Sequence, residues 1–223
     1  MAHIVGIVGK SGNGKSHGIQ FLNPKTTIVI NADRKPMPFK AWGKEWNSEN
    51  RNYLETSSPS LIKKVLKSID KDEPYKHIKT IVIDTANAIM VDDEMRRASE
   101  QNFDKWLDLA VAVYDIINIQ QAMRRDIVCF TTFHEESFLD DDGIRTTRIL
   151  TNGKKLNKIN LASRITTILW SKVECEEGGK NRHYFQTKKD NNEAKSPEGM
   201  FDTFEIENNY SFIEEAVRAY DGI

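Results

Sequence analysis

One segment near the start of the chain combines glycines, a lysine and a serine at a spacing that binds phosphates. The run from Gly9 to Ser16 (GKSGNGKS) matches G-x-x-x-x-G-K-[ST] in full, between an apolar run and a potential helix. Its glycines allow main-chain N–H groups to ring an anion, and a helix N-terminus adds its dipole. The Lys15 ammonium suits the β- and γ-phosphates of a nucleotide, and the Ser16 hydroxyl suits Mg²⁺. The predicted nucleotide-binding residues are Gly9, Ser11, Gly12, Asn13, Gly14, Lys15, Ser16 and His17.

A carboxylate that completes a metal site is expected at Asp84, which ends the apolar run Ile81-Val82-Ile83-Asp84. A strand that ends in aspartate places its carboxylate at the carboxyl edge of a parallel sheet, where open α/β sheets bind ligands. Magnesium takes oxygen ligands and is often held through a bound water. We therefore predict that Ser16 and Asp84 hold Mg²⁺ together.

Other polar residues follow predicted strands and are candidates for catalysis. Asp33 follows the second strand and could accept a proton from an attacking water, although Asn31 is not separable from it by sequence. His134 ends the fourth strand, where it could contact the γ-phosphate or that water. Lys188 and Lys189 end the sixth strand and could stabilise transferred charge in a neighbouring subunit, as an arginine finger does. The predicted catalytic residues are Lys15, Asp33, His134, Lys188 and Lys189.

The hydrophobic pattern predicts the elements that must position these residues. Continuous apolar runs rich in β-branched residues are typical of strands covered on both faces of a parallel sheet. Helical spacing of apolar residues predicts helices, and proline limits where they begin and end. Strands are expected at 3–8, 26–30, 78–84, 126–133, 164–170 and 182–187, helices at 15–22, from Pro59, at 102–125 and at 210–220, a hairpin turn within 137–148, and irregular structure at 31–52.

Composition excludes several classes of protein. The 223 residues are 39% hydrophobic and 29% charged, which is ordinary for a globular domain and favours one domain over residues 1–223. No apolar run approaches the roughly 18 residues that span a membrane, and no secretory signal is evident. The two cysteines give neither a disulfide framework nor a metal spacing, which favours a cytoplasmic location. The net charge of −1 confines any nucleic-acid site to a local patch.

Together these motifs resemble a RecA-like P-loop ATPase, in particular the small phage-encoded, AAA-like ATPases linked to single-strand annealing and recombination. The resemblance covers Ile4 to about Phe204 and depends on Gly9–Ser16, on Ile81-Val82-Ile83-Asp84-Thr85, on Thr132-Phe133-His134 and on Lys188–Pro197. It implies an α/β fold whose mostly parallel sheet has helices on both faces and a C-terminal antiparallel hairpin extension. It also implies that the strand ending at His134 lies between the Gly9 strand and the Asp84 strand.

The resemblance further implies hydrolysis of ATP with Mg²⁺ in phage DNA recombination, annealing or replication, in the host cytoplasm. It implies a homo-oligomeric ring or filament with the nucleotide between subunits, and as partners single-stranded DNA and single-strand-binding or recombination proteins. The implied DNA-contacting loops are 135–148 and about 175–182. Because the first of these loops is acidic, the basic residues of 154–158 and Arg164 are a second candidate.

Two other functions remain open from the sequence. A P-loop kinase of a small acceptor would use the same loop, but it would need an arginine-bearing lid, and no compact one is evident. A nucleotide-gated assembly module would bind ATP and scarcely hydrolyse it. Acceptor-dependent ADP release would favour the kinase, and stimulation by single-stranded DNA would favour the ATPase.

Overall fold

The fold is taken from a computed structural model that describes residues 1–100, 104–139, 143–151, 160–176 and 178–223. Apolar runs rich in β-branched residues form the four central strands of the sheet, and these strands are buried along their whole length. The strands are β1 (His3–Val8), β2 (Thr27–Asn31), β3 (Tyr53–Glu55), β4 (Thr80–Asp84), β5 (Val128–Phe133), β6 (Glu135–Leu139), β7 (Arg145–Ile149), β8 (Thr167–Cys175), β9 (Asn181–Gln186) and β10 (Glu205–Glu207). The helices are α1 (Trp42–Glu45), α2 (Pro59–Lys71), α3 (Ala86–Arg96), α4 (Asp104–Ala122) and α5 (Tyr210–Asp221), with 3₁₀ helices η1 (His17–Phe21), η2 (Glu73–Tyr75) and η4 (Leu161–Arg164).

An eight-stranded, mostly parallel sheet organises the molecule. Its order is β10-β9-β8-β1-β5-β4-β2-β3, and the strands from β8 to β3 run parallel to one another. Strands β9 and β10 continue the sheet in antiparallel pairing, which confirms the expected C-terminal hairpin extension. Strand β5 lies between β1 and β4, as the resemblance implies. The ends of β1, β4 and β5 therefore meet at one edge of the sheet.

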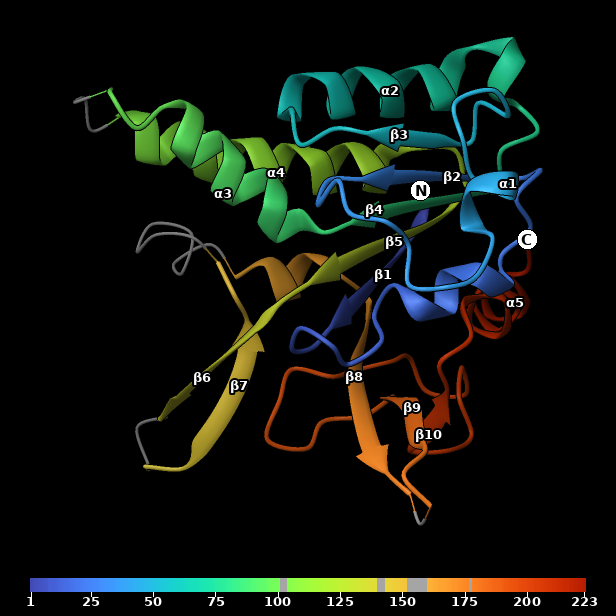
Figure 1. The fold of residues 1–223 in the computed structure, drawn as a ribbon, viewed down its shortest axis with the longest axis vertical. Coiled ribbons are helices and arrows are strands. Elements are labelled where there is room, and N and C mark those ends of the chain that lie inside the picture. The colour runs from blue at the N-terminus through green and yellow to red at the C-terminus, as the bar shows by residue number, and fades with distance from the viewer. Residues whose placement is uncertain (101–103, 140–142, 152–159, 177) are drawn as a thin grey trace.

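Helices cover both faces of this sheet (Figure 1), which confirms the α/β expectation. One face packs against α2, α3 and α4, and its core includes Ile4, Ile83 and Phe133. The other face packs against η1, α5 and the segment after β2, and its core includes Val5 and Tyr210. Because neighbouring residues of a strand point to opposite faces, Ile4 and Val5 contribute to different halves of the core.

A second, two-stranded antiparallel sheet is formed by β6 and β7, which follow directly after β5. In Figure 1 this hairpin projects away from the main sheet. It confirms the hairpin expected within 137–148, and the tip at 140–142 lies outside the described residues. The basic stretch at 154–158 also lies outside them.

The helix expected at 15–22 is wrong in type and length. Only His17 to Phe21 are helical, and they form a 3₁₀ helix rather than an α-helix. The amide of His17 donates to the carbonyl of Gly14, and that of Leu22 to Ile19, which are i→i+3 bonds. Gly18 lowers helix propensity, and Pro24 prevents continuation, so that a single tight turn precedes β2.

Several elements have no counterpart among those expected from the sequence. The irregular segment at 31–52 contains the single turn α1, and β3, α3 and β10 are not predicted at all. Helix α4 ends at Ala122, before the expected residue 125, and β8 extends to Cys175, beyond the expected residue 170. Within the described residues, no helix is both long and apolar enough to cross a membrane.

Candidate nucleotide-binding site

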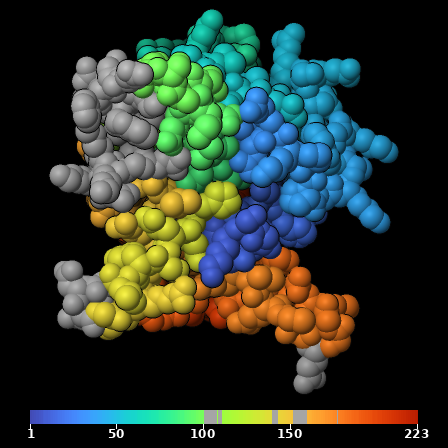
Figure 2. All heavy atoms as spheres, turned by 60° about the vertical axis from the view of Figure 1, so that its left-hand side comes forward, coloured from blue at the N-terminus to red at the C-terminus, as the bar shows by residue number. Residues whose placement is uncertain are grey.

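A cleft of about 390 Å³ opens at the carboxyl edge of the sheet, where β1, β2, β4 and β5 end. This volume is within the range of small-ligand sites in proteins. In Figure 2 the deep-blue N-terminal residues reach the surface between the light-blue segment and the orange C-terminal strands. Residues from all of these strand ends line the cleft: Ser11, Gly12, Gly14, Lys15, Ser16, His17, Asn31, Asp33, Lys35, Pro36, Met37, Pro38, Asp84, Thr85, His134 and His183.

The loop from Gly9 to Ser16 adopts a conformation that requires glycine. Gly12 and Gly14 both have φ +86°, which other residues rarely adopt. A Cβ on Gly14 would also lie 2.7 Å from Nδ1 of His183. In the part of the chain that the structure describes, the amides of Gly12, Gly14, Lys15 and Ser16 donate to no protein acceptor. An anion in this cleft would satisfy them, so the loop fits a polyphosphate.

Lys15 is buried, at 6% exposed, and its ammonium lies at the base of the loop. Its Nζ donates to the carbonyls of Gly9 and Lys10, both at 2.8 Å, and to Nδ1 of His134 at 3.3 Å. Burial lowers the pKa of Lys15 to about 8, although the charge of Asp84 opposes this shift. A desolvated cation that is held by neutral acceptors is strongly attracted to a phosphate.

Two oxygens expected to hold a metal meet at the centre of the cleft. The Ser16 hydroxyl donates to Oδ2 of Asp84 at 2.6 Å, and the Thr132 hydroxyl donates to Oδ1 at 2.6 Å. Burial raises the pKa of Asp84, and the two hydroxyl donors oppose that shift. The described residues contain no cluster of three or more His, Cys, Asp or Glu side chains that could cage a metal. The donors therefore fit Mg²⁺, which protein sites often hold by one or two oxygens together with phosphates and water.

The structure separates Asp33 from Asn31, which the sequence could not do. Asn31 is 1% exposed and its amide is committed to the turn, since Nδ2 donates to the carbonyl of Lys35 and to the Tyr53 hydroxyl. Asp33 lines the cleft, accepts from the Thr85 hydroxyl at 3.3 Å and lies 3.5 Å from Nζ of Lys35. Asp33 is therefore the better placed of the two to orient a water.

His134 joins the cleft to the β6–β7 hairpin. Its backbone amide donates to Oδ1 of Asn87 at 2.7 Å, and Asn87 also donates to the carbonyl of Leu150, which follows β7 at the base of the hairpin. Burial, with a smaller effect of the Lys15 charge, lowers the pKa of His134. An unprotonated ring is what the Lys15 contact requires, because Nδ1 must accept from the ammonium. The structure thus brings His134 to the cleft, as expected.

A pair of histidines borders the opposite end of the cleft. The ring of His17 stacks on that of His183 from β9, with centroids 5.8 Å apart and planes 28° apart. Burial, with a smaller effect of His183, lowers the pKa of His17. Phe21 meets His17 edge-on at 6.3 Å and is 48% exposed. The stacked rings of His17 and His183 therefore form an aromatic surface beside the loop.

Residues near the C-terminus of the chain form hydrogen bonds with the main chain of the loop. The side-chain amide of Asn208 donates to the carbonyl of Gly14 at 2.8 Å, and the Tyr210 hydroxyl donates to that of Lys15 at 2.5 Å. From β8, Ser171 and Asn13 exchange two hydrogen bonds of 2.7 and 2.9 Å. The loop conformation therefore depends on residues about 160 to 195 positions away in sequence.

Replacing Tyr210 tests the contribution of this contact. Tyr210→Phe removes the hydroxyl but keeps the ring that stacks on Phe130 at 4.7 Å. The buried carbonyl of Lys15 then loses its partner, and we expect the free energy of unfolding to fall by about 1–3 kcal/mol in urea denaturation. Tyr220→Phe is the control, because Tyr220 is 49% exposed. Equal stability of the two variants would show that the hydroxyl does not hold the loop.

Lys188 and Lys189 do not join the cleft of their own chain. Both side chains are exposed, and both residues follow the end of β9. Because β9 runs antiparallel to β8, that end is the one farther from His183, which lines the cleft. Their predicted action on a neighbouring subunit remains a prediction. Of the other predicted residues, those that line the cleft are Ser11, Gly12, Gly14, Lys15, Ser16, His17, Asp33, Asp84 and His134, whereas Gly9 and Asn13 support the loop from within.

Sequence patterns gave no indication of several residues that the fold brings to the site. His183, Lys35, Asn208 and Tyr210 fall in no spacing motif. Thr132 belongs to the Thr132-Phe133-His134 motif, but the sequence did not indicate its hydrogen bond to Asp84. Neither the comparison with protein-family models nor the search among curated proteins found a match. The functional argument therefore depends on the geometry of the site.

Proposed function

We propose that this chain binds ATP with Mg²⁺ and hydrolyses it, as a RecA-like P-loop ATPase. The observation that carries the proposal is the 2.6 Å contact between the Ser16 hydroxyl and the Asp84 carboxylate, beside a buried Lys15. Ser16 lies in the loop after β1 and Asp84 ends β4, and the two are 68 positions apart, so local loop structure does not explain their meeting. The loop amides without protein acceptors add the anion-binding component.

The order of the strands supports the RecA-like assignment. Strand β5 pairs with β1 on one side and with β4 on the other, so His134 lies between the phosphate loop and Asp84. The resemblance to RecA-like ATPases implies the same strand order. It gives one residue access to both the Lys15 ammonium and the β6–β7 hairpin, which suits a group that reports the state of the nucleotide.

The residues divide the work of hydrolysis among them. The loop amides and Lys15 would bind the phosphates, and Ser16 and Asp84 would hold Mg²⁺. The metal would supply neutralisation of charge on the phosphate oxygens. Asp33 orients the attacking water and can accept its proton. The His17–His183 surface offers stacking to the base, which is compatible with any purine.

The biological setting of the proposal follows from the resemblance. It places the ATPase in phage DNA recombination, single-strand annealing or replication, as a homo-oligomer in which Lys188 or Lys189 completes a neighbour's site. Single-stranded DNA and a single-strand-binding or recombination protein are the partners that this role requires.

Phosphate release from the full chain tests the proposal. We expect multiple turnovers of Mg·ATP that EDTA abolishes and that a thirty-residue oligothymidylate stimulates. A mass measurement in the same buffer reports whether ATP changes the assembly. No release and no nucleotide binding at any magnesium concentration would contradict the proposal.

One contact favours a second function, a nucleotide-gated assembly module with little hydrolysis. Nζ of Lys35 lies 3.5 Å from Oδ2 of Asp33, so one of the two carboxylate oxygens that could orient a water already faces an ammonium. Binding of Mg·ATP that changes the assembly, with less than one phosphate released per chain, would favour this module over the ATPase.

A further inference from the structure

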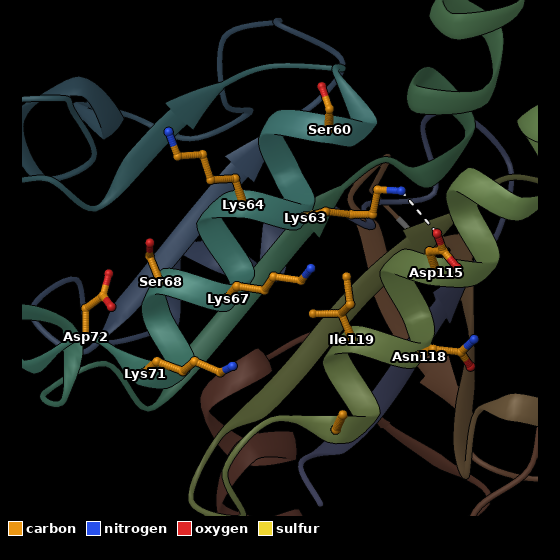
Figure 3. A pocket seen from close by; sticks show the side chains of 11 residues that line it. Ser60, Lys63, Lys64, Lys67, Ser68, Lys71, Asp72, Asp115, Asn118 and Ile119 are labelled. Atoms are coloured by element: carbon orange, nitrogen blue, oxygen red, sulfur yellow. Dashed lines mark hydrogen bonds and ion pairs between the residues drawn. The ribbon is translucent and has the colours of Figure 1, made fainter.

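A groove lined with lysines lies on the face of the molecule formed by α2 and α4 (Figure 3). Its volume is about 790 Å³, and it lies between two helices that pack against the same side of the sheet. In Figure 3 the side chains of Lys63, Lys67 and Lys71 extend from α2 toward α4, whereas Lys64 extends from the other side of the helix. The groove shares no residue with the nucleotide cleft.

The lysines form a regular row. Lys63, Lys67 and Lys71 are spaced i, i+4, i+8, which places three cations on one helix face over about 12 Å. Like charges at this spacing destabilise a helix, so helix stability does not account for the row. Lys71 lies in the last turn, where the helix dipole favours it, but Lys63 and Lys67 have no such benefit.

The opposite wall neutralises only part of this charge. Asp115 of α4 lies 3.1 Å from Nζ of Lys63, and Asp72 lies at the end of the groove. Among the described residues, Lys67 and Lys71 have no hydrogen-bond or ion-pair partner. The remaining α4 residues in the groove are Asn118, which can donate its amide, and the apolar Ile119 and Ala122. The groove is thus a local cationic site on a chain whose net charge is −1.

The types of residue favour a phosphate backbone over a protein segment. Protein interfaces are enriched in arginine and aromatic residues and depleted in lysine, and this groove has lysines but neither arginine nor aromatic residues in its lining. Lysine binds phosphate as a point charge, without the paired geometry by which arginine recognises carboxylate. A row of point charges suits a polyanion with regularly spaced phosphates. Because the groove has no aromatic surface on which bases could stack, it would not distinguish one base sequence from another.

We propose that the groove between α2 and α4 binds the phosphodiester backbone of a nucleic acid through Lys63, Lys67 and Lys71. This site lies away from the β6–β7 hairpin, as Figure 1 shows. It contributes affinity without base specificity, and its binding weakens steeply with salt because each phosphate contact releases counterions.

Fluorescence anisotropy of labelled oligonucleotides tests the groove in the full chain. With a labelled thirty-residue oligothymidylate, we expect Lys67→Glu to weaken binding roughly tenfold at low salt and to reduce the slope of log K against log salt by about 0.7 or more. The variant forms favourable i, i+4 pairs with Lys63 and Lys71, so the helix is retained. Lys67→Arg should bind as the wild type does. Lys44→Glu is the matched control, because it changes the same exposed charge on α1, over the other face of the sheet.

Duplex DNA of the same length in a parallel titration shows whether the backbone comes from a single strand or a double helix. The titrations contain no nucleotide, so a loss of oligonucleotide binding in Lys67→Glu separates this proposal from the nucleotide site. Equal losses in Lys67→Glu and Lys44→Glu, or wild-type binding by Lys67→Glu, would overturn the proposal. So would tight binding of poly-glutamate by a chain that does not bind oligonucleotides, because the groove would then fit an acidic protein.

Discussion

Lys15→Ala is expected to abolish measurable binding of Mg·ATP and to reduce turnover roughly 100- to 1000-fold, the usual loss when a buried charge-stabilising group is removed. Lys15 is the buried cation at the base of the loop, and in the absence of ligand its three donors are held by Gly9, Lys10 and His134. Calorimetric titration and phosphate release measure the two effects. Lys15→Met keeps most of the aliphatic stem, and its thermal melting shows whether the fold is intact.

The pH dependence of Mg·ATP binding tests the role of Lys15 in the wild-type chain. Burial lowers the pKa of Lys15 to about 8, so the free ammonium loses its proton as the pH rises through 8. A bound polyphosphate favours the charged form and raises that pKa. Affinity should therefore fall above pH 8, and binding at pH 8.5 should take up a proton, seen as heat that varies with the ionisation enthalpy of the buffer. A flat affinity from pH 7 to 9.5 would contradict the role of Lys15.

Asp84→Asn is expected to raise the Mg²⁺ concentration for half-maximal turnover about 10- to 100-fold, the range for residues that act on a metal through an outer-shell contact. The amide keeps one oxygen for the hydroxyls of Ser16 and Thr132 but loses the charge that attracts the metal. Nucleotide affinity in EDTA should change little, since the loop amides and Lys15 remain.

A magnesium titration of phosphate release in Asp84→Asn and in Asp126→Asn separates a metal effect from a general one. Asp126 precedes β5 at the opposite edge of the sheet, where it pairs with Lys79 and Arg124. Its substitution should leave the magnesium dependence unchanged. An unchanged half-maximal concentration in Asp84→Asn would remove Asp84 from the metal site.

The central strands were predictable because each is an uninterrupted apolar run. Strands β1, β4 and β5 are buried along their whole length, so both faces require hydrophobic residues. Helix α3 was missed because only its first turns are buried, at Ala86, Asn87, Ile89 and Met90, and the acidic residues that follow break the apolar pattern. Strand β3 has three residues and no buried one, which leaves too little pattern to detect.

The residues of the site also fall into two groups, those whose position follows from local sequence and those brought there by distant parts of the fold. Lys15, Ser16 and Asp84 could be predicted because a fixed spacing or a strand end determines where they lie. Tyr210 and His183 reach the loop only because the C-terminal strands and α5 fold back beside β1. A hydrogen bond from a tyrosine to a carbonyl 195 positions away has no signature in the sequence. Such contacts require the topology of the whole sheet.

Calorimetric titration of the wild-type chain with ATP in the presence of Mg²⁺ tests the nucleotide site most directly. We predict saturable heat with one nucleotide per chain, absent in Lys15→Ala and weakened in EDTA. A wild-type chain that is folded and yet gives no heat with any magnesium–nucleoside triphosphate would contradict the assignment of the cleft.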